Sequence, residues 1–564
     1  MIHDIYEPLV QYRDDFREKF LRIAEETYEE FTVISGVDIS ANRKTVAAIN
    51  KKKEQLDRLS GRRTLLGILT AFLWVCAIIS LVYGGFQFFD RSSFKGDHFA
   101  VCICVLVISA LLLFAVYSKT SKLDKLIALI SAEKSKLVSE AWQQMSELNA
   151  LFNWETITSM VSKCVPRLEF DPYYNSARAE ELECFFGLNS DLGDTVSVKF
   201  VHSGVINDNP FLIANVFKQV WGTATYTGTK VISYVETVRD SDGKLRRETR
   251  YQTLYATVTK PKPEYEEENM VIYGNEAASR LNFSRQPSEH AGKDGFFNNL
   301  SKKRELKKLE KFARNLTDDS NFTMMSNKEF EVLFHADDRN DEVEFRVLFT
   351  PLAQEQMVRL LNDTEVGYGD DFHFRKNGMI NVVFPMHLNG SCLDVDPSRF
   401  AGYSYDNVKQ YFISRSCDFF KSVYFAFAPL LTIPLYQQTR TSRSIYRDNG
   451  RKGISSWESE SFINYLGRSR FAHSDSITEN ILKSSGLQDS ADGAVTVDAH
   501  GFKGIDRIEL VPVYGNDGRW HNVPVPWVEY VPVCKTSRIN VAVADESSAV
   551  SDTENVRRRI FMRS

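Results

Sequence analysis

Two uncharged apolar runs, residues 64–89 and 99–118, constrain this 564-residue chain more than any other feature. A helix needs roughly 20 apolar residues, each rising about 1.5 Å, to cross the hydrocarbon core of a bilayer. Both runs are long enough, and only residues 90–98 separate them, so they predict a tight transmembrane hairpin with an external loop. The alternative is a pair of buried core helices, but soluble cores rarely need helices without a polar face.

The charges that flank the hairpin predict its orientation. The loop carries only Arg91 and Lys95, beside two aspartates, whereas both outer flanks are rich in cations. Lys and Arg are retained on the cytoplasmic side during insertion, so both termini are expected in the cytoplasm. The flanking cations are Lys51, Lys52, Lys53, Arg58, Arg62, Arg63, Lys119, Lys122 and Lys125.

The two runs contain no Asp, Glu, Lys, Arg or His. Pumps and transporters usually place such residues inside the membrane to bind ions or relay protons. The hairpin is therefore interpreted as an anchor. An oligomeric channel lined by Thr70, Ser80 or Ser109 is the alternative that this pattern leaves open.

Long helical segments are predicted on both sides of the hairpin. Residues 1–63 carry an apolar stripe at steps of three or four, interrupted at Gly36, and residues 119–165 form a second striped stalk. The two stripes are predicted to pack on each other within one chain, because partners are close in sequence. A coiled coil between chains, giving a homo-oligomer, is the alternative.

A strand-rich domain is predicted over residues 166–284. β-branched and aromatic residues fill the segment 225–259 on both sides of Asp240-Ser241-Asp242-Gly243. Asp-Gly accepts the positive φ of a type I′ turn, so this segment predicts a long β-hairpin with strands of about a dozen residues. Such strands exceed the usual length, and the hairpin is expected to protrude.

Residues 285–301 are polar and predict a linker before an α+β domain at 302–400. A basic amphipathic helix opens that domain. The favoured interpretation packs Leu306, Leu309 and Phe312 on a sheet with the cations in solvent; the alternative lays the helix on an anionic membrane. Its cations are Lys302, Lys303, Arg304, Lys307, Lys308 and Lys311.

The rest of the 302–400 domain is predicted as strand, strand, helix, strand, strand. The expected strands are Glu329–Phe334, Glu342–Phe349, Asp371–Phe374 and Met379–Phe384, with Pro351 opening the helix. An acidic turn, residues 337–341, joins the first two. It lacks the alternating ligands and central Gly of an EF-hand loop, so a solvated turn is favoured over a calcium site.

Part of the chain, about residues 164–384, resembles a family of uncharacterised bacterial two-span membrane proteins that share a domain of unknown function and are often encoded near LemA-type proteins. The resemblance implies a bacterial inner-membrane protein with a possible LemA-like partner. It supplies no catalytic residues. The resembling stretches are Phe330-Glu331-Val332, Phe345-Arg346-Val347-Leu348-Phe349-Thr350-Pro351, Phe372-His373-Phe374 and Ile380-Asn381-Val382-Val383.

Residues 401–540 predict a C-terminal α+β region. Its apolar segment Val423–Tyr436 is too short for a third span and is expected to be buried, while the polar segment 455–493 is expected to be rich in loops. A hairpin is predicted at Asn516-Asp517-Gly518. Pro524, Pro526 and Pro532 remove N–H groups from one side of the return strand, which predicts a sheet edge.

The last residues, 541–564, predict a disordered tail with a basic cluster at Arg557-Arg558-Arg559. The eight cysteines are scattered without metal-binding spacing, so reduced thiols are expected. The slightly acidic balance, a net charge of −5, argues against nucleic-acid binding.

No residue pattern predicts a catalytic site, a cofactor site or a metal site. Asp394 and Asp396 form a DxD, interpreted as a loop with a capping Asp, and His373, His387, His500 and His521 are isolated in or beside predicted strands. Trp520 and His521, near Trp527, are explained equally by a pocket or by a cross-strand aromatic cluster.

The predicted protein is thus an α+β membrane protein: a two-helix transmembrane hairpin with long cytoplasmic helical extensions, followed by cytoplasmic domains with mixed antiparallel sheets. Its bilayer anchor and cytoplasmic domains favour a scaffold, sensor or assembly module. A membrane-bound enzyme with a scattered site and a subunit of an oligomeric channel are the alternatives.

Overall fold

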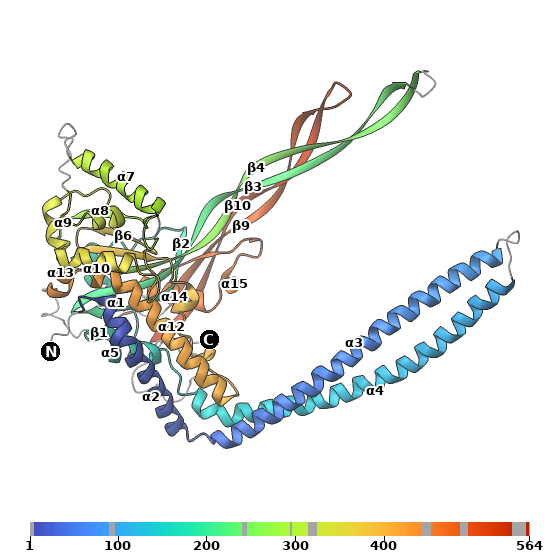
Figure 1. Cartoon of the computed structure of the whole chain (residues 1–564), viewed down its shortest axis with the longest axis horizontal. Helices are drawn as coiled ribbons and strands as arrows, with labels where there is room; N and C mark the ends of the chain where they lie inside the picture. Colours follow the sequence, from blue (N-terminus) through green and yellow to red (C-terminus); the bar gives the residue numbers. More distant parts are fainter. Residues whose placement is uncertain are drawn as a thin grey trace. The chain divides into compact units, whose positions relative to one another are not determined.

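The computed structural model describes residues 5–89, 96–239, 245–293, 296–313, 324–441, 453–485, 494–543 and 560–562. It confirms an α+β chain with two long apolar helices and antiparallel sheets (Figure 1). Residue contacts divide the chain into two units. We call residues 25–153 and 397–414 the helical unit, and residues 1–24, 154–396 and 415–564 the sheet unit.

The helical unit is built on α3 (Ile39–Phe89) and α4 (Gly96–Asn149), of 51 and 54 residues. The preceding helix α2 (Arg17–Ser35) ends at Gly36, whose φ of +61° is a conformation that favours glycine. Asp38 then caps α3, because its Oδ1 accepts hydrogen bonds from the backbone N–H groups of Ser40 and Ala41. The predicted break at Gly36 is confirmed.

α3 and α4 pack along each other as an antiparallel pair. Cys102, Ser109, Val116 and Ile130 of α4 are buried and are spaced by seven residues or a multiple of seven. A seven-residue repeat keeps one seam facing the partner helix, as in a coiled coil. The ion pairs Lys52–Glu133 and Arg63–Asp124, each 2.5 Å, cross the seam outside the apolar runs. The packing predicted within one chain is confirmed for residues 39–63 along residues 119–149, whereas at the start of the chain Tyr12 and Phe20 stack on Phe420 instead.

The base of this helical pair holds the segment that leads into α12 (Tyr405–Leu431). Asn42 donates a hydrogen bond to the carbonyl of Tyr403 and accepts one from the N–H of Tyr405. Asn149 makes the same two-way exchange with Gly402. Paired backbone groups of this kind satisfy a chain segment that lacks regular secondary structure.

The sheet unit contains a seven-stranded antiparallel sheet in the order β1-β2-β3-β4-β7-β6-β5. β3 and β4 have 31 and 30 residues and extend well beyond the sheet as a two-stranded ribbon (Figure 1). The predicted hairpin is confirmed but is more than twice as long as expected; its turn, residues 240–243, lies outside the described residues. The strands are β1 (Leu168–Phe170), β2 (Val196–Ile206), β3 (Asn209–Arg239), β4 (Leu245–Gly274), β5 (Asn282–Arg285), β6 (Phe372–Asn377) and β7 (Ile380–Pro385).

A second sheet has the order β11-β10-β9-β8, with β8 (Ile481–Ser485), β9 (Ala494–Tyr514), β10 (Trp520–Val543) and β11 (Ile560–Met562). The hairpin at residues 516–518 is confirmed. In the described part of the chain, β10 pairs over residues 520–540 with β9 alone, which confirms the edge predicted from the prolines. β10 continues through Val543 and pairs with β11, so the prediction of a tail disordered from residue 541 is wrong at these two places.

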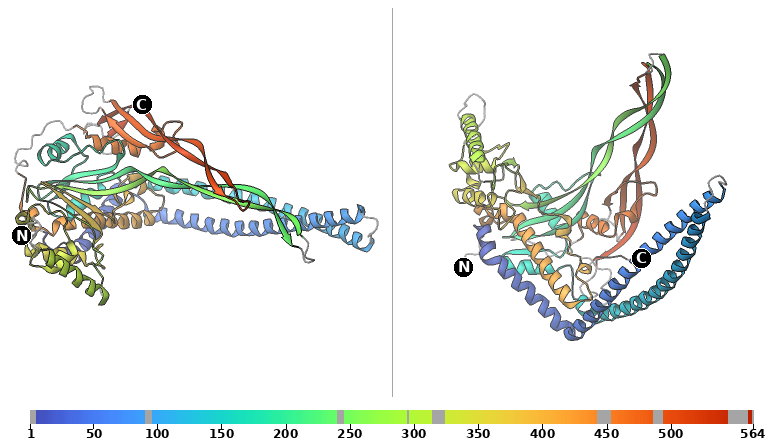
Figure 2. Two further views of the ribbon diagram at one scale, coloured as in Figure 1. Left: turned by 90° about the horizontal axis from the view of Figure 1, so that it is seen from above. Right: turned by 45° about the vertical axis from the view of Figure 1, so that its right-hand side comes forward.

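The two ribbons pack face to face through a small apolar core, seen from two sides in Figure 2. Ile232 and Leu254 of one ribbon contact Val523 and Val525 of the other. At Gly228 the backbones come so close that an added Cβ would lie 2.1 Å from the carbonyl oxygen of Pro524. Only glycine permits this approach.

Two predicted strands are helices: α8 (Lys328–Phe334) and α9 (Glu342–Leu348). The side chains of Asn327 and Asp341 accept hydrogen bonds from N–H groups of the first turn and so start each helix. In each of these two segments a pair of phenylalanines four residues apart lies on one face. Three of these rings surround Phe283, with centroids 5.6–5.9 Å from its own. They are Phe334, Phe345 and Phe349, with Phe330 stacked on Phe334.

The helix predicted at Pro351 is confirmed as α10 (Pro351–Leu361), and the strand pair that follows it is confirmed as β6 and β7. The predicted linker 285–301 is wrong in its last part, because α7 (Phe296–Ala313) begins inside it. Val423–Tyr436 lies in α12 and α13 (Pro434–Gln438) and is buried almost throughout, as expected.

The prediction of loops over residues 455–493 is also wrong, because α14 (Ser456–Tyr465), α15 (Arg468–Phe471) and β8 fall within it. The polar residues of α14 are buried since they replace strand partners for β2. Glu460 accepts a hydrogen bond from the N–H of Val198, which lies beside a bulge in β2. Asn464 donates a hydrogen bond to the carbonyl of the same Val198. Paired polar groups of this kind can be buried without penalty.

The contact at Gly228 gives a first prediction. We expect Gly228→Ala to lower the free energy of unfolding by about 1–3 kcal/mol, because the new methyl group forces the ribbon backbones apart. Thermal unfolding of the purified full chain measures this. Gly222→Ala is the matched control on the same strand, since its Cβ would meet only the flexible carboxylate of Glu264. Equal melting temperatures for the two variants would contradict the described ribbon packing.

Candidate functional site

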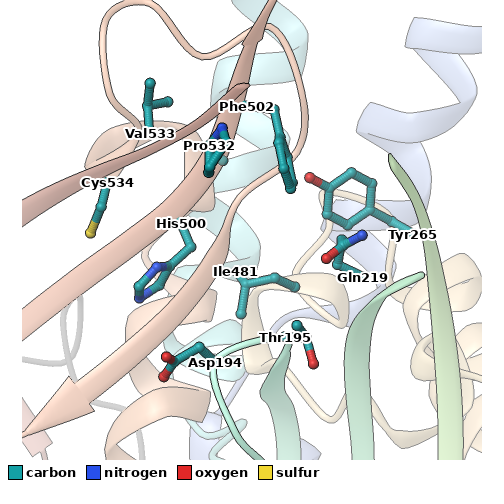
Figure 3. A pocket seen from close by; sticks show the side chains of 11 residues that line it. Asp194, Thr195, Gln219, Tyr265, Ile481, His500, Phe502, Pro532, Val533 and Cys534 are labelled. Atoms are coloured by element: carbon teal, nitrogen blue, oxygen red, sulfur yellow. The ribbon is translucent and has the colours of Figure 1, made fainter. Parts of the chain in front are cut away.

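A pocket with a volume of about 260 Å³ lies in the sheet unit, where β3 and β4 approach β9 and β10 (Figure 3). Its lining is mostly apolar, with a few polar side chains, which is the usual character of small-molecule pockets. The lining residues are Asp194, Thr195, Gln219, Tyr265, Ile481, His500, Gly501, Phe502, Pro532, Val533 and Cys534.

Tyr265 fixes one wall of this pocket. Its ring stacks on Phe217, with centroids 5.3 Å apart, and its hydroxyl donates to Thr478 Oγ1 at 3.1 Å. Thr478 Oγ1 also accepts from the N–H of Phe502, so one hydroxyl joins both walls. Burial raises the pKa of Tyr265, which keeps the phenol neutral.

His500 and Cys534 are cross-strand partners on β9 and β10 at the other side of the pocket. Partial burial, reinforced by the charges of Asp498 and Asp194, raises the pKa of the Cys534 thiol. A thiol with a raised pKa is a weak nucleophile and a poor metal ligand at neutral pH. The pocket is therefore poorly suited to thiolate chemistry.

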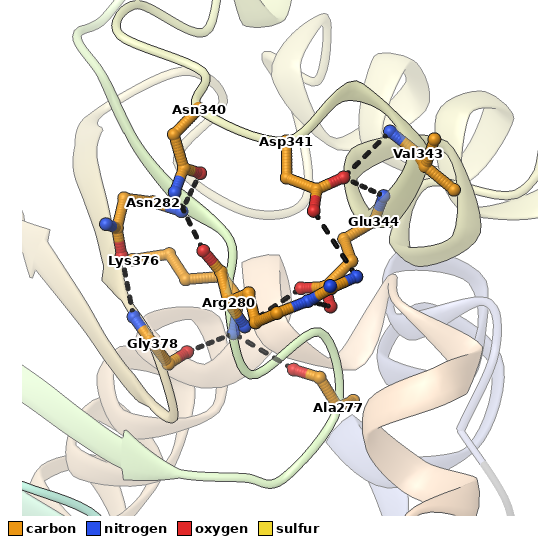
Figure 4. A network of polar contacts seen from close by, with 9 residues as sticks. All are labelled: Ala277, Arg280, Asn282, Asn340, Asp341, Val343, Glu344, Lys376 and Gly378. Atoms are coloured by element: carbon orange, nitrogen blue, oxygen red, sulfur yellow. Dashed lines mark hydrogen bonds and ion pairs between the residues drawn. The ribbon is translucent and has the colours of Figure 1, made fainter.

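A second polar feature is a continuous hydrogen-bond network under α9 (Figure 4). Lys376 is 1% exposed, and its Nζ donates to the carbonyls of Ala277 and Gly378 at 3.1 and 2.7 Å. The N–H of Gly378 donates to Asn282 Oδ1, and the N–H of Asn282 donates to Asn340 Oδ1. The network thereby connects β5, β6 and the turn before α9.

Burial lowers the pKa of Lys376 to about 7, and the carboxylate of Glu344 opposes this only in part. The pKa of this amine is thus close to neutral pH, although its partners are backbone carbonyls. Carbonyl acceptors at fixed distances are typical of a structural lysine. The ring of Tyr436, whose centroid is 5.6 Å from Nζ, covers it further.

The acidic turn at 337–341 has structural roles in place of metal binding. Asp341 caps α9 and also lies 3.5 Å from the guanidinium of Arg280, while Asp337 pairs with Ser284 through the backbone. Arg339 is buried against Glu331 at 2.9 Å. Within the described residues there is no group of three or more His, Cys, Asp or Glu that could hold a metal ion.

The other candidates from the sequence are not brought together. Asp394 of the DxD follows α11 (Gly390–Leu393) and accepts a hydrogen bond from the N–H of Asp396. His387 lies between Asp371, at 2.7 Å, and the carbonyl of Ser422, and stacks on Tyr368. The structure thus gives His387 a structural role.

Trp520 and His521 belong to the end of the second ribbon. Trp520 packs on its cross-strand partner Tyr514, with centroids 5.4 Å apart, and His521 lies 2.8 Å from Asp517 in the turn. Trp527 instead lies under the ammonium group of Lys260. Separate cross-strand contacts, rather than one shared pocket, account for these side chains.

The hydroxyl groups considered for a pore are found near the seam between α3 and α4. Ser109 is 3% exposed, and its hydroxyl donates to the carbonyl of Leu106; Thr70 donates likewise to Leu66. Ser80 is half-buried. All eight cysteines are free thiols, as expected.

Sequence reasoning missed one feature, the outer face of the β3–β4 ribbon. Odd-numbered positions of β3 from 223 to 239 are exposed, as are their partners on β4, whereas the even-numbered Gly228 and Ile232 face the second ribbon. The alternation of Thr with other residues from 223 to 229 was the available signal. This face carries large exposed side chains: Val231, Val235, Leu245, Tyr251 and Tyr255.

Together these features define the class of the protein: an α+β chain in which a long apolar helical hairpin accompanies a double β-ribbon. Comparison with protein-family models, curated proteins and solved structures finds no match for the chain.

The buried lysine gives a second prediction. The pKa of Lys376 is about 7 in the fold and about 10 when unfolded, so between these values the unfolded chain binds one proton more. Its contribution to stability therefore rises with pH across that window. We expect Lys376→Met to remove up to roughly 1 kcal/mol per pH unit of that rise, measured by chemical unfolding of the full chain at several pH values.

Lys535→Met, at an exposed position, is the control and should keep the wild-type pH slope. If Lys376→Met and the wild type have parallel stability curves from neutral to alkaline pH, Lys376 is not buried as described.

Proposed function

We propose that this protein is a membrane-anchored scaffold or assembly module, in which the α3–α4 hairpin crosses the bilayer and the sheet unit contacts other proteins. The apolar surface of the hairpin is the observation that carries the proposal. In the most apolar 18-residue windows of α3 and α4, only 6% and 17% of the helix is buried. Both helices are long and apolar enough to span a membrane.

The distribution of side chains around the two helices supports insertion. Leu73 of α3 and Cys102, Ser109 and Val116 of α4 are buried in the seam, while most other large apolar side chains of the two runs are exposed. Ile79 and Ile108, near the middle of the two runs, are 62% and 56% exposed, and Phe114 is 75% exposed. Contiguous apolar surface of this extent is costly in water and favourable in lipid.

We infer from the flanking cations that both termini are cytoplasmic, with the loop between α3 and α4 outside. The resemblance to bacterial two-span proteins extends the proposal to the bacterial inner membrane. A LemA-type partner is part of the same proposal and remains to be tested.

The exposed face of the β3–β4 ribbon supports the scaffold role. Aromatic residues supply large contact area at low cost in conformational entropy and are enriched in the cores of protein interfaces. Tyr251 and Tyr255 on β4 are 74% and 65% exposed, and Tyr514 and Trp520 on the second ribbon are 56% and 70% exposed. Extended ribbons present such residues far from the core of a domain.

Membrane insertion gives a third prediction. We expect the double variant Ile79→Arg with Ile108→Arg to leave the carbonate-resistant membrane fraction or to be degraded, because each Arg at a span centre costs about 2.5–3.5 kcal/mol. The control is Leu126→Arg with Leu129→Arg, at exposed positions of α4 beyond the apolar run. Wild-type and control chains should stay in the membrane. Equal membrane retention of both double variants would contradict insertion of the hairpin.

Orientation gives a fourth prediction. A reporter that is active only in the cytoplasm should give signal when fused to either end of the chain, and an externally active reporter should give none. Loss of the cytoplasmic signal at one end would overturn the two-span topology.

Crosslinking in native membranes, followed by affinity purification, tests the scaffold role. Partners lost on substitution of Tyr251 and Tyr255 by Ser support that role, whereas partners retained by this variant contradict it.

A further inference from the structure

Helix α7 carries an unusual concentration of positive charge. Six cations lie within the ten positions from 302 to 311, in a chain whose overall net charge is −5. They are Lys302, Lys303, Arg304, Lys307, Lys308 and Lys311, and all but the half-buried Lys302 are exposed. Within the described residues, the structure records no ion pair for these five exposed cations.

The two acidic residues of this stretch are committed to partners in their own domain. Glu305 Oε2 lies 2.7 Å from His290 Nε2, and Glu310 Oε1 lies 2.7 Å from the ammonium group of Lys328. Leu306 lies on the same side and is half-buried. The helix therefore docks through its acidic and apolar residues, and the surface opposite is cationic.

Helical geometry collects the exposed cations on one face. Lys303, Lys307 and Lys311 follow one another at steps of four, and Arg304 and Lys308 are offset from them by one residue, so all five lie within about 140° of the helix circumference. The helix has 18 residues, enough to present several turns to a flat partner. Clusters of four to eight Lys and Arg on an amphipathic helix are typical of contacts with anionic phospholipids.

We propose that the exposed cationic face of α7, formed by Lys303, Arg304, Lys307, Lys308 and Lys311, binds the anionic headgroup surface of a membrane. This inference rests on the proposed anchoring, because a tether in the same chain keeps lipid at a high effective concentration. Charge complementarity then favours headgroups carrying negative charge over zwitterionic ones. The contact is peripheral and reversible, in contrast to the permanent insertion of α3 and α4.

The test reconstitutes the full chain into vesicles of phosphatidylcholine alone or of phosphatidylcholine with phosphatidylglycerol, and follows hydrogen–deuterium exchange over residues 296–313. We expect exchange in this segment to be several-fold slower on the anionic vesicles, and high salt to abolish the difference. The variant with Lys303, Arg304, Lys307 and Lys308 all changed to Gln should show no difference between the two vesicles.

The matched control changes four other exposed cations, Arg246, Arg247, Arg519 and Arg538, to Gln and should behave as the wild type. Equal exchange on both vesicles overturns the proposal, as does loss of the effect in the control. Equal protection on zwitterionic vesicles by added RNA would assign the face to nucleic acid and also overturn it.

Failure of the anchor is recognised separately, by flotation. If the chain does not float with either vesicle, the proposed insertion of the hairpin is wrong. If it floats with both and α7 exchanges equally, only the headgroup contact is wrong.

Discussion

The sheet unit depends on one backbone pairing, the antiparallel ladder between β3 and β4. It runs without a register shift from Phe211 and Tyr273 in the sheet to Arg239 and Leu245 in the ribbon. Its inner part pairs on both sides, with β2 and β7, and becomes the centre of the seven-stranded sheet. An isolated two-stranded ribbon is marginal in water, so the outer part needs a second layer. The β9–β10 ribbon supplies that layer, and the pocket forms where the two ribbons leave the sheets.

The helical unit follows a different rule, in which one seam continues from the charged part of the α3–α4 pair into its apolar part. The seven-residue spacing of buried positions continues from Ile130 to Cys102, although ion pairs border the seam at one end and apolar side chains at the other. Cys102, Ser109 and Val116 occupy the seam of the apolar part, and a small side chain such as that of Ser109 lets helix backbones approach closely. Function on the outward face is thereby separated from packing on the inward face. The proposed anchoring requires only the outward face.

Structural elements with a single hydrophobic period, or with clear turn residues at their ends, were predictable from the sequence. The helix break at Gly36, the hairpins at residues 240–243 and 516–518, and the edge marked by Pro524 and Pro526 all rest on local backbone chemistry. Predictions failed for two reasons, an ambiguous periodicity and a partner that is distant in sequence. Phe330 and Phe345 fit strand alternation as well as helical spacing, and the caps Asn327 and Asp341 decided between them. The polar side chains of α14 resemble a loop until β2, whose backbone they bond, is seen beside them.

The candidate sites were less predictable than the fold for a physical reason. The pocket lined by Tyr265 and His500 is formed by six segments that are separate in the sequence, so no local spacing of residues indicates it. Charge is read more easily, but its role depends on burial. Arg285 and Arg178 look like any surface cations in the sequence, yet both are buried against carboxylates, Arg285 on Asp370 at 2.6 Å.

Removing one member of such a buried pair leaves an unpaired charge that costs several kcal/mol, so these arginines are fixed in structural roles. The cations of α7 are in the opposite situation. Their helix has already used its acidic residues for docking, and water is the only partner that the described fold provides for them. An exposed charge can bind an oppositely charged surface at little cost in solvation free energy, whereas a buried charge must stay with its partner. Function in this chain is therefore expected at its surfaces. Those surfaces are the outward faces of α3, α4 and α7 and the outer face of the β3–β4 ribbon.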